Sequence, residues 1–391
     1  RSEGELRDAF QSVERLAKNN FSQGGLYIEK YVEHARHIEV QIFGDGFGYV
    51  VALGERDCSL QRRNQKVVEE TPAPGISEEL RTQLLQYSVR LAESVKYQSA
   101  GTVEYVYDID RDEFYFLEVN TRLQVEHGVT EQVTGVDLVE WMIRVAAGET
   151  EFLRRYRHNP RGHSVQVRLY SEDPARQFRP SSGLLTEVSL PSDIRVDTWV
   201  RSGTEVSAYY DPMLAKLISY AETREQAIAN LTAGLRESRI YGIETNLEYL
   251  EVLLSDPVFI KAQHFTRYLS NKEFYSPTIE VIQPGTQSCI QDYPGRVGYW
   301  DIGVPPSGPM DQYAFRLANR VLGNGEQCPA LEITVTGPTL KFNTDVVIAL
   351  AGASMQATLD GDAIDFWEPV SVKRGSVLKL RGIQGAGQRA Y

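Results

Sequence analysis

The stretch that most constrains this chain runs from residue 114 to residue 130 and has the sequence FYFLEVNTRLQVEHGVT. Its first residues alternate as in a strand, with Phe114 and Phe116 on one face. Steps of two along that face lead to five polar residues: Glu118, Asn120, Arg122, Gln124 and Glu126. An extended backbone would direct all five to one side, where they form either a solvated edge of a sheet or the wall of a catalytic cleft.

The residues before this stretch predict a hairpin over 102–119 that brings two carboxylates together. If Asp110 to Asp112 form a three-residue turn, Glu104 lies directly opposite Glu118. Facing like charges destabilise a strand pair, and a divalent cation between them would remove that cost. Two carboxylates plus substrate phosphates around Mg²⁺ or Mn²⁺ are expected in a nucleotide enzyme. A register shift of one residue would undo the pairing.

A run of mixed charge at 55–70, ERDCSLQRRNQKVVEE, admits two interpretations. Mixed charge of this kind usually faces solvent. The same residues also suit a polyphosphate and metal site, because cations bind oxyanions and carboxylates bind divalent ions.

The remaining patterns predict a chain of mixed helices and strands. Helices are expected over 4–18, from Ser77 to about 96, over 136–147 and from Thr223 to about 239. The segment 19–25, including Gln23 and Gly24, would end the first helix. Strands are expected at 26–32, 37–43, 49–53 and 163–170, and those at 186–190, 194–199 and 214–219 would continue a second sheet. The buried stripe of the second helix would be Leu80, Leu84, Leu91 and Val95.

Glycine, proline and short β runs become frequent after about residue 275, where we place a domain boundary. Asp311 would cap a helix that ends at Gly323, and Asp360-Gly361 predicts a hairpin turn. The loop 305–311 would run into that helix N-terminus, where it either binds an anion or serves as a structural turn.

Composition narrows the class of protein. The formal charge of -12 argues against a broad nucleic-acid or anionic-membrane surface. Three well-separated cysteines indicate a reducing, cytoplasmic compartment without a disulfide framework. No apolar run is long enough to span a membrane. The chain starts within a helical pattern and stops within a β-rich one, so we expect its function to belong to a longer parent.

Several long motifs in order resemble the biotin carboxylase component of biotin-dependent carboxylases, which has an ATP-grasp fold. The match covers about residues 1–270 and is carried by EKYVEHARHIEVQ at 29–41, ERDCSLQRRNQKVVEETPAPG at 55–75, GTVEY at 101–105, FYFLEVNTRLQVEHGVTE at 114–131, Glu172-Asp173-Pro174 and YYDPMLAKL at 209–217. It implies the end of an ATP-grasp lid subdomain at 1–31, a core with the metal and bicarbonate site at 32–160, and a C-terminal subdomain at 161–272.

This resemblance also implies roles for individual residues. Nucleotide-binding positions would be Glu29, Lys30, Val32, His37, Gln61 and Asn64. The metal site would be Glu104, Glu118 and Asn120, and the bicarbonate pocket Lys66, Arg122, Gln124, Val125 and Glu126. Among the catalytic residues, which include Arg122 and Lys66, Glu126 would deprotonate bicarbonate and Arg168 would steady the biotin enolate.

The chain departs from the biotin carboxylase pattern in three respects. Asn64 stands where many relatives have histidine, and Gly128 replaces a common proline. Since Asn64 can still donate a hydrogen bond, we expect tuning of nucleotide binding at that position. The family's N-terminal domain, with its glycine-rich phosphate loop and early ATP-binding lysine, has no counterpart in the sequence, so the chain alone is not expected to turn over.

Residues 276–391 resemble a different family, the allophanate hydrolase subunit 2-type domain, and are expected to be the N-terminal part of a β-rich carboxyltransferase domain. The match is carried by IQPGTQSCIQDYPGRVGYWDIGVPPSGPMDQYAFRLANRVLGN and ALEITVTGPTL. Candidates for a second active site are Asp292, Arg296, Ser307 and Asp311. The predicted fold class is therefore α+β, an ATP-grasp portion followed by a β-rich portion.

The combination of the two resemblances is similar to that in urea carboxylases and their fusions with an amidase. It implies that ATP and bicarbonate give carboxyphosphate, whose CO₂ carboxylates biotin, before the carboxyl group passes to urea to give allophanate. The implied cofactors are ATP, Mg²⁺ or Mn²⁺, and biotin on a carrier domain outside this chain; a homo-oligomer is a further expectation. One alternative is another amide, guanidine or lactam acceptor. Another is a non-catalytic nucleotide-binding regulatory protein. The residues that weigh against it are the retained Glu104, Glu118, Arg122, Glu126 and Arg168.

Overall fold

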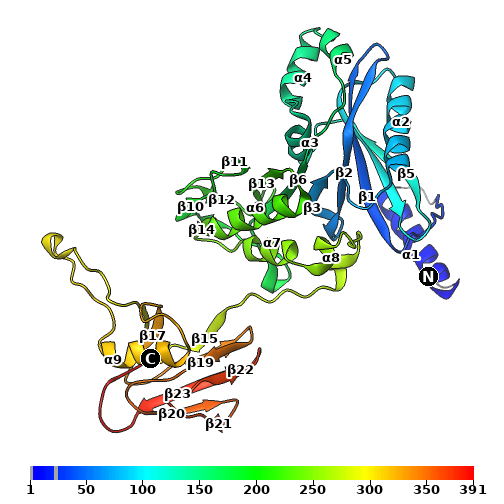
Figure 1. The fold of residues 1–391 in the computed structure, drawn as a ribbon. Coiled ribbons are helices and arrows are strands. Elements are labelled where there is room, and N and C mark those ends of the chain that lie inside the picture. Colours follow the sequence, from blue (N-terminus) through cyan, green and yellow to red (C-terminus); the bar gives the residue numbers. More distant parts are fainter. Residues whose placement is uncertain (1–2, 22–24) are drawn as a thin grey trace.

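One large sheet with helices on both faces forms most of the molecule, and a β-rich part follows at the C-terminal end (Figure 1). The computed structural model describes residues 3–21 and 25–391. The first predicted helix is α1 (Glu3–Phe21). The expectation that Gln23 and Gly24 end it lies outside the described residues.

The large sheet has eight strands in the order β11-β13-β6-β3-β2-β1-β4-β5, and each neighbouring pair is antiparallel. Its strands are β1 (Ala35–Asp45), β2 (Val50–Arg62), β3 (Gln65–Thr71), β4 (Gln98–Asp108), β5 (Glu113–Asn120), β6 (His163–Tyr170), β11 (Arg195–Thr198) and β13 (Met213–Ala221). The prediction that 194–199 and 214–219 belong to a second sheet is wrong. Strand β6 pairs with β3 on one side and β13 on the other, so the sheet continues across them.

The helices over this sheet are α2 (Glu78–Ser94), α3 (His127–Thr134), α4 (Leu138–Ala146), α5 (Glu151–Arg155), α6 (Arg224–Glu237), α7 (Leu247–Leu254) and α8 (Pro257–Ile260). The predicted cap of α2 is confirmed, because the Ser77 side chain accepts a hydrogen bond from the Leu80 amide. Helix α3 was not predicted from the sequence. Its N-cap position is Glu126, so it begins directly after the polar stretch that opened the sequence argument.

The buried stripe of α2 was only partly predicted. Leu80 and Leu84 are buried against β1 and β4, but Leu91 and Val95 are exposed. The stripe continues instead through Ser88 and Ala92. The Ser88 hydroxyl lies 2.8 Å from the Tyr105 hydroxyl, which satisfies both groups inside the core.

Two further predictions about the sheet are corrected by burial. Residues 26–32 do not form a strand, and the side chains of Tyr27 and Ile28 are more than 70% exposed. The alternating pattern was therefore not sufficient to predict a strand there, because no other strand in the described part of the chain pairs with this segment. The solvent-facing interpretation of 55–70 is also wrong for most of its strand residues. Arg56, Asp57 and Glu69 are almost completely buried on β2 and β3, in the middle of the sheet.

Short elements complete this part of the chain. They are β7 (Glu172–Asp173), β8 (Arg179–Pro180), β9 (Gly183–Leu184), β10 (Glu187–Ser189), β12 (Glu205–Val206), β14 (Arg239–Tyr241), η1 (Pro174–Arg176) and η2 (Tyr268–Asn271). An apolar core lies between β6, β13, α6 and α7, where Val167, Leu217, Leu231 and Leu250 are fully buried. Within the described ranges, no helix combines the length and the hydropathy needed to cross a bilayer.

The C-terminal part has its own apolar core and several small antiparallel sheets. Its elements are β15 (Ile279–Gln283), β16 (Gln287–Gln291), η3 (Trp300–Ile302), α9 (Gln312–Val321), β17 (Ala330–Thr334), β18 (Thr339–Phe342), β19 (Val346–Ile348), β20 (Met355–Leu359), β21 (Asp362–Ala363), β22 (Val370–Val372), β23 (Val377–Ile383) and β24 (Arg389–Ala390). The Asp311 cap and the Asp360-Gly361 hairpin are both confirmed. The α+β class predicted from the sequence is therefore correct.

Candidate active site

A cluster of charged side chains lies on one face of the large sheet, where β1, β3, β4 and β6 are near the loop that leads into α3. Lys66 on β3 is at its centre. Its ammonium group donates to three carboxylates, 2.6 Å from Glu39, 3.0 Å from Glu104 and 2.5 Å from Glu126. Burial alone would lower the pKa of Lys66, but these carboxylates raise it well above its ordinary value. The lysine is therefore a fixed cation shared by three anions.

A second cation approaches Glu126 from β6. Arg168 donates through a terminal nitrogen to Glu126 Oε2 at 3.0 Å and through Nε to Glu69 at 2.5 Å. The two oxygens of Glu126 thus accept from different cations, Lys66 on Oε1 and Arg168 on Oε2. Charge-assisted bonds of this length are among the stronger contacts in proteins. A carboxylate held in this way has a fixed position and orientation.

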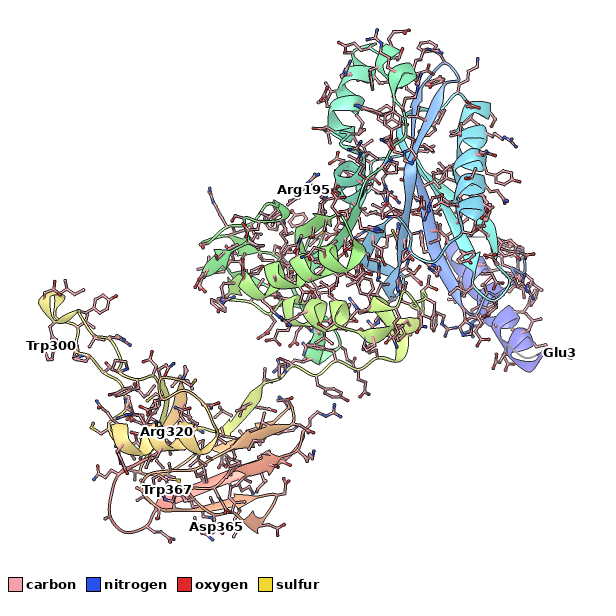
Figure 2. All side chains as sticks on the ribbon, in the orientation of Figure 1. Glu3, Arg195, Trp300, Arg320, Asp365 and Trp367 are labelled. Carbon is pink, nitrogen blue, oxygen red and sulfur yellow. The ribbon has the colours of Figure 1, made fainter. Side chains whose placement is uncertain are left out.

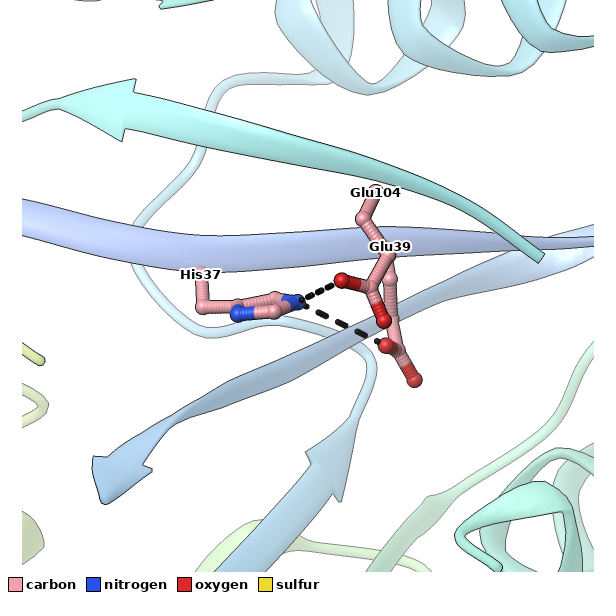
Figure 3. A group of neighbouring side chains, drawn as sticks. All are labelled: His37, Glu39 and Glu104. Carbon is pink, nitrogen blue, oxygen red and sulfur yellow. Dashed lines mark ion pairs between the residues drawn. The ribbon is translucent and has the colours of Figure 1, made fainter. Parts of the chain in front are cut away.

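The side chains of His37, Glu39 and Glu104 meet in this cluster (Figure 3). Lys66 contacts both of these carboxylates. His37 Nε2 lies 3.2 Å from Glu104 and 3.7 Å from Glu39. Burial lowers the pKa of His37, but its contacts with Glu104 and Glu39 outweigh this and raise the pKa to about 9. In the structure this trio is an ion-pair cluster.

A buried arginine, for which the sequence predicted no role, also donates hydrogen bonds to this cluster. Arg56 on β2 is completely buried and donates to Glu39 at 2.6 Å and to the Gln124 side chain at 3.2 Å. It also donates to the hydroxyl of Thr130 on α3 at 3.0 Å. The only sequence signal for this role was its place in the charged run, between Glu55 and Asp57. One side chain thus links β1, the loop after β5 and the first turns of α3.

The predicted metal ligands are brought together by the β4–β5 hairpin. Glu104 and Glu118 are direct cross-strand partners, as predicted. The predicted turn was wrong, because four residues, 109–112, connect the paired residues Asp108 and Glu113. A bulge at Leu117 then adds one residue to β5 and restores the register. Asn120 donates to Glu118 at 3.2 Å.

This donor set fits a hard divalent cation. Glu104 and Glu118 offer carboxylate oxygens and Asn120 offers an amide oxygen, which are the ligand types that Mg²⁺ and Mn²⁺ prefer. Direct pairing of two carboxylates is unfavourable without a cation nearby. Glu104 already contacts two cationic side chains, so its oxygens would be shared between Lys66, His37 and a metal.

The remaining bicarbonate candidates lie in the loop between β5 and α3. Gln124 is buried and donates to Glu104 at 2.8 Å, and the Val125 carbonyl accepts from Lys216 at 3.0 Å. Arg122 is exposed and lies near the carbonyl of its neighbour Leu123. The expectation of five polar side chains on one extended face is wrong, because β5 ends at Asn120 and the chain then bends into α3.

Only some of the residues predicted to bind the nucleotide lie close to one another in the structure. Gln61 on β2 places its side-chain amide 3.0 Å from His37 Nδ1. Asn64 is exposed in the two-residue β2–β3 turn with φ of 65°, a left-handed conformation that asparagine tolerates well. Glu29, Lys30 and Val32 lie in the segment without regular structure before β1, where Lys30 donates to the Tyr115 hydroxyl at 3.0 Å.

The second-site candidates lie around the loop before α9. The backbone amide of Arg296 donates to Pro306, next to Ser307, and this contact closes the base of the loop, whose exposed tip includes Trp300 (Figure 2). Asp311 caps α9, and its backbone amide donates to the Tyr391 hydroxyl at 2.7 Å.

Anion binding at the start of α9 has less support than a structural turn. The Met310 amide donates to Glu332 at 2.7 Å, so one of the protein's own carboxylates already occupies this position. Tyr391 donates to the same carboxylate at 2.7 Å. The predicted loop is therefore fastened to β17 by side chains of the chain itself.

Comparison with protein families divides the chain into three matched segments. Residues 1–153 match the carbamoyl-phosphate synthase L chain, ATP binding domain. Residues 166–271 match the biotin carboxylase C-terminal domain, and residues 302–391 match the carboxyltransferase domain, subdomain A and B.

Individual proteins are similar over longer spans. Urea amidolyase of Saccharomyces cerevisiae is 50% identical over 390 residues, which cover 100% of this chain and 21% of that protein. The crystal structure of Kluyveromyces lactis urea carboxylase superposes with a TM-score of 0.80 at 53% identity, covering 91% of this chain and 32% of that one. The biotin carboxylase domain of Hydrogenobacter thermophilus 2-oxoglutarate carboxylase, solved with MgADP, ADP and bicarbonate, gives a TM-score of 0.64 at 40% identity over 69% of this chain and 60% of that one.

Proposed function

This chain belongs with the urea carboxylases and urea amidolyases, to which it is homologous along its whole length, and from that premise we propose that it is part of a biotin-dependent urea carboxylase. The proposed enzyme uses ATP and bicarbonate to carboxylate biotin, and the carboxyl group then passes to urea to give allophanate. The chain spans 21% of the length of the urea amidolyase it matches, so the activity is proposed for a longer parent protein.

The observation that carries the first half-reaction is the position of Glu126 between Lys66 and Arg168. In the proposal Glu126 accepts the proton of bicarbonate. Lys66 and Arg168 hold its two oxygens and supply positive charge for the anionic substrate. Arg122, Gln124 and Val125 complete the bicarbonate pocket. In the proposal Arg168, which donates to the other oxygen of Glu126, faces biotin, as the resemblance to biotin carboxylases implies.

The nucleotide and its metal would lie beside this pocket. Glu104, Glu118 and Asn120 would hold Mg²⁺ or Mn²⁺, which supplies charge neutralisation for the phosphates of ATP. Glu29, Lys30, Val32, His37, Gln61 and Asn64 would bind the nucleotide. The related domain solved with MgADP and bicarbonate supports the binding of both ligands by this part of the chain.

In the proposal, each segment of the chain belongs to one domain of the parent. We assign 1–31 to the end of the ATP-grasp lid, 32–160 to the ATP-grasp core and 161–272 to the biotin carboxylase C-terminal subdomain. Residues 276–391 would be the N-terminal part of the carboxyltransferase domain, with Asp292, Arg296, Ser307 and Asp311 as candidates for its active site. Biotin would be attached to a carrier domain elsewhere in the parent. A cytoplasmic location and a homo-oligomeric state are part of the proposal.

The test is ATP consumption by the full-length parent with bicarbonate and a panel of acceptors: urea, a simple amide, a guanidine and a lactam. Urea-dependent ATP consumption, with allophanate detected as product, is the expected result. Dependence on another acceptor would replace urea in the proposal. Nucleotide binding without bicarbonate-dependent hydrolysis would favour a regulatory protein.

A further inference from the structure

Glu69 is a completely buried carboxylate on β3 to which the proposed reaction gives no role. Its side chain faces the site, and two side chains of β6 donate to it. Arg168 Nε lies 2.5 Å from Oε1 and Gln166 Nε2 lies 3.0 Å from Oε2. Both oxygens of Glu69 are therefore engaged, and the direction of each is fixed by the pairing of β3 with β6.

The guanidinium of Arg168 is held from two directions. Glu69 accepts from Nε, and Glu126 accepts from a terminal nitrogen at 3.0 Å. A guanidinium is planar, so two bonds to different anchors fix the rotation of the whole group. Its plane is then set before any ligand arrives.

The two anchors differ in what happens to them during the proposed reaction. Glu126 accepts a proton, and once neutral it attracts Arg168 and Lys66 much less strongly. Each cation has a further, fully buried carboxylate to which the proposed reaction assigns no proton transfer: Glu39 for Lys66 and Glu69 for Arg168. These carboxylates would keep both cations in place while Glu126 changes charge.

We propose that Glu69 is a positioning residue for biotin carboxylation, which acts through Arg168 by holding its guanidinium in the biotin-facing orientation while Glu126 is protonated. This inference rests on the proposed function, because it presupposes that Arg168 faces biotin. Glu69 itself contacts no substrate. Its effect is therefore confined to the step in which Arg168 participates.

The variant Glu69→Gln tests this role with little expected disturbance of packing. Gln166 Oε1 is buried without a hydrogen-bond partner among the described residues. If the Gln166 amide turns over, this oxygen can accept from the new amide at position 69, and Arg168 can still donate to the remaining oxygen. The substitution then removes the negative charge and keeps the shape.

The matched control is Glu70→Gln, on the same strand. Glu70 is also buried, and it accepts from Arg224 at 2.5 Å and 2.9 Å, away from the charged cluster. Both variants remove one buried carboxylate that is paired with an arginine. A general loss of stability would affect the two alike, whereas a positioning role belongs to Glu69 alone.

The experiment measures biotin carboxylated per ATP consumed, with melting temperature, in the full-length parent and in the variants Glu69→Gln, Glu70→Gln and Arg168→Lys. Glu69→Gln and Arg168→Lys are expected to lower this ratio at least about tenfold, and Glu70→Gln to leave it within about threefold. An unchanged ratio in Glu69→Gln, with a low ratio in Arg168→Lys, overturns the inference. An unchanged ratio in Arg168→Lys overturns the role given to Arg168 in the proposed function.

A second variant covers the case in which Glu69→Gln does not fold. Glu69→Asp keeps the charge and withdraws the carboxylate from Arg168 by one methylene. It is expected to lower the ratio of biotin carboxylated to ATP consumed in the same direction. A wild-type ratio in this variant would also contradict a positioning role.

Discussion

Glu104 on β4 and Glu118 on β5 are direct cross-strand partners. A divalent cation shared by the two carboxylates would convert an unfavourable pair into a stabilising one. We therefore expect millimolar Mg²⁺ or Mn²⁺ with ATP to raise the melting temperature of the protein by about 2–4 °C. Glu118→Gln should abolish most of this increase. The matched control is Glu113→Gln on the same strand, which should keep it. Equal increases in wild type and Glu118→Gln would show that the metal binds elsewhere.

Glu126 is expected to be essential for chemistry and dispensable for folding. Glu126→Gln keeps the size of the side chain but cannot accept the proton of bicarbonate, so biotin carboxylation in the full-length parent should fall at least about 100-fold. Thermal unfolding followed by circular dichroism should still show a cooperative transition. Glu131→Gln is the control, because Glu131 is a nearby carboxylate on α3 that is paired with Arg195 outside the cluster. Carboxylation by Glu126→Gln at the wild-type rate would remove Glu126 from the reaction.

The β4–β5 hairpin shows how far local sequence could predict the structure. The pairing of Glu104 with Glu118 was predicted from an assumed three-residue turn, and the molecule reaches it with a four-residue connection and a bulge at Leu117. Two errors of one residue cancelled. Turn length and bulges depend on how the strand packs, which the alternation of residues does not specify.

The charged cluster could be predicted only in part because burial depends on contacts that are distant in sequence. Lys66 contacts Glu126, which lies 60 residues later in the sequence, and the roles of both were predicted from the family resemblance. Arg56 contacts Thr130, which lies 74 residues later. Charges at 55–70 are typical of a solvated surface when only neighbours are considered. The antiparallel pairing of β3 with β6 places them in the middle of the sheet, and neither strand's own sequence indicates that pairing.

A second buried network, around Asp57, should contribute to acid stability. Burial would raise the pKa of Asp57, but Arg36 and His264 beside it hold this pKa well below the ordinary value of 3.8. A carboxyl group with a depressed pKa stabilises the fold above its unfolded-state value. That stabilisation is lost as the pH falls below 3.8 toward the folded-state value. Asp57→Asn lacks this contribution at every pH.

The melting temperatures of wild type and Asp57→Asn should therefore differ most at neutral pH and converge in acid. The difference in unfolding free energy should shrink by about 1.4 kcal/mol for each pH unit below the ordinary pKa of the carboxyl group. Asp193→Asn, a change at an exposed loop position without an ion pair among the described residues, is the control and should follow wild type throughout. A constant gap between wild type and Asp57→Asn from pH 7 to pH 2.5 would contradict the assigned depression of the pKa.

Gly128, one of the positions at which the sequence departs from the expected biotin carboxylase pattern, is buried in the first turn of α3. A Cβ atom at this position would lie 2.4 Å from Cδ1 of Ile218 on β13, far inside van der Waals contact. Alanine favours a helix over glycine by about 1 kcal/mol, but overpacking a buried site costs about 1–3 kcal/mol. We therefore expect Gly128→Ala to lower the stability of the protein.

Ile218→Val provides the decisive comparison, because it removes the Cδ1 atom that the new methyl group would meet. Alone it should cost about 0.5–1.5 kcal/mol, since it deletes a buried methyl group. Combined with Gly128→Ala it should restore stability relative to Gly128→Ala alone, so the two substitutions should be non-additive when unfolding is measured in a double-mutant cycle. Additive losses would show that the helix moves away from β13 to accept the methyl group. Because Glu126 is the N-cap residue of α3, such a movement should also weaken its contacts with Lys66 and Arg168 and lower biotin carboxylation in the parent.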